Sequence, residues 1–183
     1  MASEDATPPY PWYHEVTDGS LEQGDLLNNV PLIALEPPYD AVALEPGNRP
    51  RVRVRLGRVI VLTQSCDLEA GKVDNVLVCP HFPPEELATT IEELRTPKGR
   101  KRVSQGMVVS AYLLPPCNLP GYEGGQRVVN FRQLATVPFD IAMSIADLQR
   151  QRIRLVTPYR EHIAQALARF IERVGLPMNY PEI

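Results

Sequence analysis

Two hydrophobic runs in this chain each lead into residues that could carry chemistry. The β-branched run of residues 59–65 is followed by Cys66 and Asp67, a thiol beside a carboxylate. A second run, residues 75–79, ends in a thiol and leads through a proline to His81. Such runs are typical of buried strands, which deliver polar residues to the end of a sheet. If the two strands are neighbours, we expect both thiols and the imidazole at one end of one sheet.

These residue types permit a thiol-dependent reaction. A thiolate is the nucleophilic form of cysteine, and a neighbouring imidazole activates it. His81 would serve Cys66 in this way, and Asp67 would orient the imidazole. The alternative is inert packing, because cysteine is among the residue types most often buried. Catalysis predicts rapid labelling of Cys66 by iodoacetamide near neutral pH, and packing predicts slow labelling.

Two further arrangements use the same part of the chain. In phosphodiester chemistry, Arg58 would stabilise the charge that develops at phosphorus while His81 transfers a proton. The alternative is a surface ion pair between Arg58 and Asp67. A structural zinc site would need three thiolates and one imidazole, here Cys66, Cys79, Cys117 and His81. The close cysteine pair usual in zinc sites is missing, so we expect no metal and no other cofactor.

The distribution of charge indicates a partner that carries phosphate. The formal net charge is −3, but residues 1–50 contain nine acidic side chains and one basic one, whereas residues 51–183 contain eighteen basic and thirteen acidic ones. The basic clusters are Arg51, Arg53, Arg55 and Arg58, and Lys98, Arg100, Lys101 and Arg102. Such clusters favour nucleic-acid binding. Alternating arginines on the exposed face of an edge strand also protect against aggregation, which is the structural alternative.

Length and composition indicate one domain without a membrane segment. Residues 1–20 are rich in proline and acidic groups and are expected to form a partly disordered arm, and residues 21–183 a single domain. No run approaches the roughly 20 apolar residues needed to cross a bilayer, and the acidic N-terminus does not resemble a secretion signal. Three cysteines are an odd number for a disulfide framework, so we expect reduced thiols and a cytoplasmic location.

The hydrophobic pattern predicts a turn-rich β protein with helices placed late. The expected strands are residues 24–27, 30–35, 51–54, 58–65, 75–79, 107–114 and 127–137. A helix opens at Pro84, with an apolar stripe of Leu87, Ile91 and Leu94, which is interpreted as core. Ser144 is predicted to cap a short helix. An amphipathic helix is predicted from Pro158 to a stop at Gly175.

The order of these elements resembles that of the PemK/MazF-type toxins. It consists of a strand opened by Gly24 and Asp25, the paired runs 58–62 and 76–80, the run 128–137 and the C-terminal helix. The resemblance implies an α+β fold: a small, strongly bent, antiparallel SH3-like β-barrel with a helical insertion and a C-terminal amphipathic helix. It also implies a homodimer that cleaves single-stranded RNA.

In that family an arginine at the start of the second long strand and a serine or threonine after the next strand carry the cleavage. Arg58 matches the arginine, and His81 stands where the hydroxyl residue would be. The resemblance therefore implies a degenerate or modified endoribonuclease, or an RNA-binding relative.

We therefore expect a bacterial, cytoplasmic, toxin-like protein directed at nucleic acid. Arg53, Arg55 and Arg132 are assigned to phosphate, and any reaction to Cys66, Asp67, His81 and Arg58. Phe131 and Tyr122, near Arg132, are candidates for base stacking. One alternative is a non-enzymatic interaction module of a defence or toxin-like system, which binds a partner protein through the N-terminal arm. The other is a thiol-dependent enzyme that uses Cys66.

Overall fold

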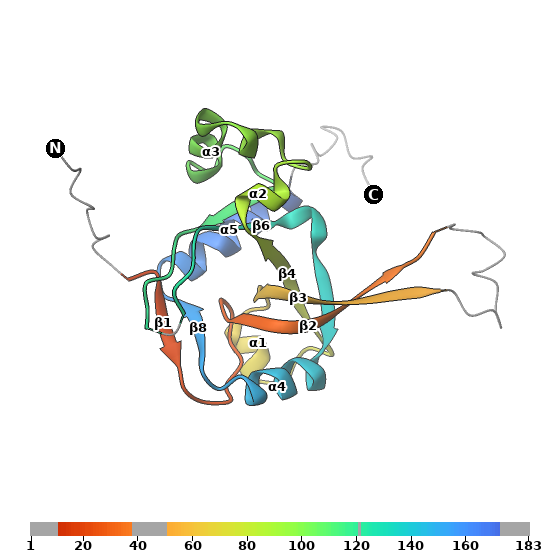
Figure 1. Cartoon of the computed structure of the whole chain (residues 1–183). Helices are drawn as coiled ribbons and strands as arrows, with labels where there is room; N and C mark the ends of the chain where they lie inside the picture. Colours follow the sequence, from red (N-terminus) through yellow and green to blue (C-terminus); the bar gives the residue numbers. More distant parts are fainter. Residues whose placement is uncertain (1–10, 38–50, 121, 173–183) are drawn as a thin grey trace, which may run out of the picture. The chain divides into compact units, whose positions relative to one another are not determined.

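The computed structural model describes residues 11–37, 51–120 and 122–172. Within these ranges the chain separates into two compact units, each formed by more than one segment of the chain. Figure 1 labels the helices and strands. Unit 1 contains residues 11–14, 82–132 and 155–172, and unit 2 contains residues 15–81 and 133–154. Cys66, Asp67, His81 and Arg58 all fall in unit 2, so the predicted reactive residues can be compared within one unit.

Unit 2 is built on an antiparallel sheet. Its strands, in spatial order, are β2 (Leu26–Leu35), β3 (Val52–Val61), β4 (Asn75–Phe82) and β7 (Ala135–Pro138). The pairing of β2 with β3 shifts register between Leu27 and Val30, where Asn29 has a φ of 53°. Such a bulge bends a strand. The predicted antiparallel α+β arrangement is confirmed, and the sheet is open, because no ladder among the described strands joins β2 to β7.

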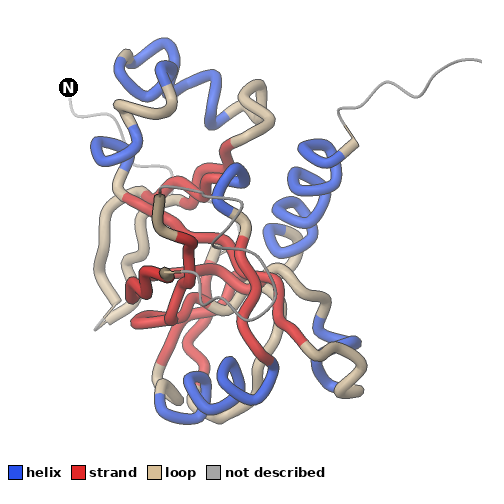
Figure 2. Tube along the Cα trace, turned by 90° about the vertical axis from the view of Figure 1, so that its right-hand side faces the viewer, coloured by secondary structure: helices blue, strands red, loops and turns tan. Residues whose placement is uncertain are grey.

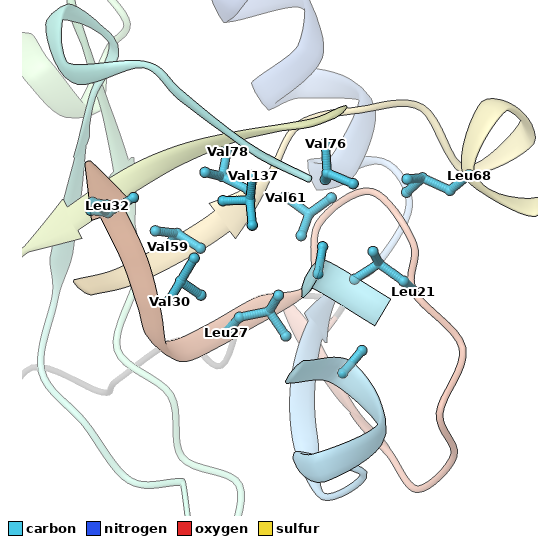
Figure 3. Close-up of a cluster of buried hydrophobic side chains, with 12 residues drawn as sticks. Leu21, Leu27, Val30, Leu32, Val59, Val61, Leu68, Val76, Val78 and Val137 are labelled. Carbon is cyan, nitrogen blue, oxygen red and sulfur yellow. The ribbon is translucent and has the colours of Figure 1, made fainter. Parts of the chain in front are cut away.

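A core cluster of unit 2 lies on one face of this sheet (Figure 3), and Ile60 and Cys79 are buried on the other face. On β3 and β4 its side chains are two residues apart, as the alternation of a strand requires, and on β2 the bulge separates Leu27 from Val30 by three residues. The labelled sheet residues are Leu27, Val30, Leu32, Val59, Val61, Val76, Val78 and Val137. Helix α4 (Phe139–Leu148) covers them through Ala142 and Ala146, one turn apart, whose small side chains allow a close approach.

Helix α4 differs from its prediction at the N-terminus. It begins at Phe139, after Pro138, and Ser144 lies in its interior. The Ser144 hydroxyl donates to the carbonyl oxygen of Asp140, four residues earlier, at 2.7 Å. A serine inside a helix can satisfy its hydroxyl in this way, so the residue type alone did not identify a cap.

The segment around Cys66 is helical and does not continue a strand. β3 ends at Val61, and helix α1 (Ser65–Glu69) follows after a short turn. The amides of Leu62 and Thr63 both donate to the carbonyl of Leu77, and the Gln64 carbonyl accepts from the amides of the next turn. The predicted strand over residues 58–65 is therefore wrong beyond Val61, because these hydrogen bonds turn the chain.

The predicted helix at Pro84 is broken into three short pieces. They are α2 (Pro84–Leu87), the 3₁₀ turn η2 (Glu92–Arg95) and α3 (Pro97–Ser104). The β-branched residues after α2 disfavour a helix, and Ile91 has extended backbone angles. Leu87, Ile91 and Leu94 are nevertheless all buried in one cluster of unit 1, so the prediction that they belong to the core is confirmed.

Unit 1 also contains a β-hairpin and the last helix, and Figure 2 shows this helix as several continuous blue turns. The hairpin pairs β5 (Ala111–Leu114) with β6 (Arg127–Asn130), and the short η3 turn (Phe131–Gln133) follows. Helix α5 (Tyr159–Ile171) buries Ile163 and Leu167, as its stripe predicts. Its predicted stop at Gly175 lies outside the described residues.

A further ladder pairs β1 (Tyr13–Val16) with β8 (Arg152–Leu155). Part of the predicted N-terminal arm is therefore a strand, and its first ten residues lie outside those described. Among the described residues, no helix combines the length and the apolar character needed to pass through a membrane.

Candidate functional site

The structure does not bring Cys66 and His81 together. β3 and β4 are antiparallel, with Val61 opposite Val78 and Val59 opposite Pro80. The end of β3 therefore lies beside the beginning of β4, and the residues that follow the two runs point to opposite ends of the sheet. Cys66 comes after Val61, whereas His81 lies three residues past Val78 in the other direction, about 10 Å along the strand. A shared thiol and imidazole centre does not form.

The Cys66 thiol is exposed in the first turn of α1. Its sulfur lies 3.7 Å from Gln64 Oε1 and 3.9 Å from Asp67 Oδ1, both hydrogen-bond acceptors. In the described part of the chain, no imidazole or cation contacts this sulfur, and no three His, Cys, Asp or Glu side chains are placed to hold a metal ion. The four residues considered for zinc are therefore not gathered into a metal site within the described chain, and the described contacts of the Cys66 sulfur include no imidazole or cation that would activate it.

Arg58 and His81 do share one face of the sheet. Ile60 on β3 lies opposite Cys79 on β4. Arg58 comes two residues before Ile60 and His81 two residues after Cys79, so both side chains are on the same face as this pair. Arg58 is exposed, but His81 is only 6% exposed. A general acid or base must reach the proton that it transfers, so the burial of His81 speaks against its predicted role.

The main polar cluster of unit 2 is one that sequence reasoning missed. Asp25 is fully buried and binds two arginines of β8. Arg152 Nη2 lies 3.0 Å from Asp25 Oδ2, and Arg154 Nε bonds to Asp25 Oδ1. Burial alone would lower the pKa of the Arg154 guanidinium, but the hydrogen bond and charge of Asp25, with the charge of Glu22, raise it. The sequence feature that could have indicated this cluster is the pair of arginines on either side of Ile153, which a strand places on one face.

This cluster holds several segments of unit 2 in place. Arg152 also donates to the carbonyl oxygens of Asp18, Ala146 and Gln149, so it connects the turn before β2 with the end of α4. Its guanidinium donors are engaged by the protein itself, and the arrangement is structural. Removing one partner of such a buried ion pair destabilises the fold strongly, whatever the pair itself contributes to the free energy of unfolding.

The turn that carries Asp25 also positions the Cys66 segment. Gln23 Nε2 donates to the carbonyl of Leu62 at 2.9 Å, and the Gln23 amide donates to the Ser65 hydroxyl at 3.2 Å. These bonds fix the end of β3 and the start of α1. The polar residues around Cys66 therefore have a structural explanation that needs no reaction.

The two longest strands of unit 2 form a ribbon that we call the β2–β3 arm, residues 30–35 and 52–57, in which Val30 and Leu32 still pack in the core and most of the other side chains are exposed. Figure 1 shows its two strands running side by side beyond the rest of the sheet. The ladder with β4 begins only at Val59, so β2 is the partner of β3 along the arm. Alternate side chains of a ribbon point to opposite faces. The arm therefore has two faces of different chemistry.

One face of the arm is basic. Arg53 and Arg55 lie on it, and the Arg53 side chain is 69% exposed. Arg53 Nε lies 3.0 Å from Glu36 Oε1, and Arg55 Nη2 donates to Gln133 Oε1 at 3.2 Å. Exposed pairs of this kind contribute about 0–1 kcal/mol, so a phosphate group can displace them. Arg58 is an odd number of residues from Arg53 and Arg55 and therefore lies on the opposite face. The sequence-based grouping of Arg58 with the other arginines in one basic cluster is corrected.

The opposite face of the arm is apolar and exposed. Its side chains, with exposures between 46% and 70%, are Ile33, Leu35, Val52, Val54 and Leu56. The arm therefore carries exposed arginines on one face and large uncovered aliphatic groups on the other.

Arg132 belongs to unit 1 and lies exposed in η3. Its neighbour Phe131 is 1% exposed, with its ring 5.8 Å from that of Phe170. The predicted stacking role of Phe131 is therefore wrong, since a buried ring offers no face to a base.

Comparison with known proteins does not place the chain in a family. No protein-family model matches the chain. A search of curated proteins likewise finds no similar sequence. The function must be inferred from the geometry of the described residues.

Proposed function

We propose that this protein binds single-stranded RNA through the basic face of the β2–β3 arm. The observation that carries the proposal is the position of Arg53 and Arg55, exposed on one face of a projecting ribbon. Their α-carbons are about 7 Å apart along the strand. Arginine suits this role because its planar guanidinium forms paired hydrogen bonds with phosphate. The neighbouring Arg51, also exposed, extends the row.

The proposal is for binding without cleavage. His81 is buried, and the Cys66 sulfur has only acceptors as hydrogen-bond neighbours. Neither residue supplies the hydroxyl group that the PemK/MazF-type toxins place after the second run. The protein is proposed to be an RNA-binding relative of those toxins, with the bent sheet of unit 2 as an opened SH3-like barrel. A cytoplasmic location fits its three free thiols.

A second candidate is a protein-interaction module. It is favoured by the apolar face of the arm, whose five large aliphatic side chains are 46–70% exposed on one continuous surface, as binding surfaces for proteins often are. In this case the aliphatic face would bind a partner protein, and RNA would not be needed. Exchanging Val54 and Leu56 for threonine would then abolish the interaction and leave RNA affinity unchanged.

RNA binding is tested by fluorescence anisotropy with a labelled single-stranded oligonucleotide at low salt. The double variant Arg53→Gln/Arg55→Gln should bind about tenfold more weakly, a change of about 1.4 kcal/mol. The matched control is Lys72→Gln/Arg150→Gln, which removes the same charge from exposed positions of unit 2 off the arm. It should stay within about twofold of wild type. Equal losses in the two double variants would show that only net charge matters and would remove the arm as the site.

The same RNA, recovered and analysed on a gel, tests for cleavage. We expect intact RNA with wild-type protein. Cleavage that His81→Ala or Cys66→Ala abolishes would contradict the proposal and restore the nuclease interpretation.

A further inference from the structure

Unit 1 contains a cleft that the arm does not explain. Its volume is about 400 Å³, within the range of roughly 300–1,000 Å³ typical of small-molecule sites. One wall is the end of α3 and the turn that leads into β5, and the other is α5. All its lining residues belong to unit 1, so the cleft is formed within that unit.

The α5 wall supplies positive charge and hydrogen-bonding groups. It is formed by His162, Gln165, Ala166 and Arg169, which follow the spacing of one helical face. Arg169 is exposed, and its one described bond is from Nε to the Gln165 carbonyl at 3.4 Å, within the helix. Among the described residues that line the cleft there is no aspartate or glutamate. Within the described lining, the cleft therefore favours an anion, because no carboxylate there competes for the guanidinium.

The rest of the lining is aromatic and apolar. Trp12 lines the cleft and stacks on Tyr159, with ring centres 3.6 Å apart and planes 13° from parallel. Tyr112 also lines it, and burial, with the charge of Tyr159, raises the pKa of the Tyr112 phenol to about 12. Tyr112 is therefore a neutral hydroxyl at physiological pH. Val108 and Ala111 supply apolar surface. Aromatic and apolar walls beside an exposed guanidinium suit a flat ring that carries an anionic group.

We propose that this cleft binds a nucleoside 5′-monophosphate, either free or as the phosphorylated end of an RNA strand. Arg169 and His162 contact the phosphate, and Trp12 and Tyr112 contact the base. Ser104 and Gln105, on the opposite wall, are within the lining and supply polar groups for the sugar or the base edge. This site does not depend on the arm, so it goes beyond the RNA-binding function.

The protein contains its own probe for this site. Trp12 is the single tryptophan of the chain and lies in the cleft. Its fluorescence is followed during titration with AMP, adenosine and inorganic phosphate, and equilibrium dialysis with labelled AMP gives a readout independent of Trp12. AMP should bind at least tenfold more tightly than adenosine, because only AMP carries the group that Arg169 recognises. Inorganic phosphate should bind more weakly than AMP, because it lacks the ring.

Two charge-matched variants of unit 1 test the assignment. Arg169→Gln should weaken AMP binding at least fivefold, whereas Lys101→Gln, which removes an exposed charge of α3 outside the lining, should change it less than twofold. Circular dichroism confirms that both variants are folded. The arm variant Arg53→Gln/Arg55→Gln should keep full AMP affinity, so failure of RNA binding by the arm leaves this test intact.

The source of the phosphate is decided with short RNAs that differ only in a 5′-phosphate or a 5′-hydroxyl. Binding that requires both the 5′-phosphate and Arg169 supports the site and assigns it to a strand end. Binding of AMP with the same dependence assigns it to a free nucleotide. No saturable binding of AMP or of the phosphorylated RNA in dialysis, or equal affinities of AMP and adenosine, would overturn the proposal.

Discussion

At the scale of single residues, the charges that organise unit 2 are not those that stood out in the sequence. Cys66 and His81 attracted attention because each follows a hydrophobic run, but their distance depends on whether the two strands are parallel or antiparallel. That is a tertiary property, and no local pattern encodes it. Asp25 was assigned no role, although a buried carboxylate needs partners. Arg152 and Arg154 supply them from a strand more than 120 residues away, a separation that the sequence does not reveal.

Asp25→Asn should strongly destabilise the protein. The substitution keeps the shape of the side chain but removes the carboxylate that two buried guanidinium groups share, so Arg154 keeps Glu22 as a partner and Arg152 keeps only its backbone carbonyls. We expect a loss of about 3–5 kcal/mol in the free energy of unfolding, measured by urea denaturation. Asp147→Asn is the matched control, because Asp147 pairs with Arg150 at the surface, and such a pair contributes about 0–1 kcal/mol. Similar losses in both variants would contradict the role of Asp25.

Tyr13 should make the protein sensitive to alkali. Burial, and to a smaller extent Cys117 and Tyr112, raises the pKa of the Tyr13 phenol above its ordinary value of 10.0. Its contribution to stability is thus complete below pH 10.0 and is lost as the pH rises toward the pKa of the folded state. Tyr13→Phe removes the 2.9 Å hydrogen bond to the Pro115 carbonyl, which costs about 1 kcal/mol at pH 7.

The measurement is the urea midpoint as a function of pH for Tyr13→Phe and wild type. Above pH 10.0 the variant should lose stability less steeply than wild type, with a residual slope from Tyr112. Parallel curves over this range would show that Tyr13 does not titrate differently on folding.

At the scale of elements, the sequence predicted which residues are buried better than it predicted the elements that carry them. Leu87, Ile91 and Leu94 were assigned to the core and are buried, yet the continuous helix that their spacing implied is interrupted. The spacing of apolar residues indicates which side chains lie together in the core. Whether they stand on one continuous helix also depends on the residues between them, here the β-branched Thr89 and Thr90, which disfavour a helix. The basic segment after them, which stood out in the sequence only as a charge cluster, is helix α3, and Thr96 caps it by accepting from the Gly99 amide at 3.0 Å.

Gly99→Ala tests this arrangement of short elements. A β-carbon at Gly99 would collide with the backbone carbonyl of Glu93 in η2, and a backbone atom cannot move aside as the end of a side chain can. We expect a loss of roughly 2 kcal/mol or more, measured by thermal and urea unfolding. Gly125→Ala is the control, since its β-carbon would meet no atom within 4 Å and should leave stability nearly unchanged. If Gly99→Ala unfolds at the same temperature and urea concentration as wild type, η2 and α3 are not in contact at this position.

At the scale of the whole molecule, each of the two compact units carries one of the two proposed ligand-binding surfaces. The arm of unit 2 carries exposed arginines on one face and aliphatic groups on the other, and the cleft of unit 1 joins a cation to aromatic walls. The sequence predicted the arginine row, because alternation is local. It did not predict the cleft, because its walls come from segments that are distant in sequence and meet only in the folded unit.

The most direct test of RNA binding by the arm is the salt dependence of affinity. For single strands, the slope of log K against log salt concentration is about −0.7 for each phosphate neutralised, so two arginines contribute about −1.4. We predict that wild-type protein binds single-stranded RNA with a slope at least this steep, and that Arg53→Gln/Arg55→Gln lowers its magnitude by about 1.4 while Lys72→Gln/Arg150→Gln does not. A slope that the arm substitutions leave unchanged, or no binding even at the lowest salt concentration, would contradict the account.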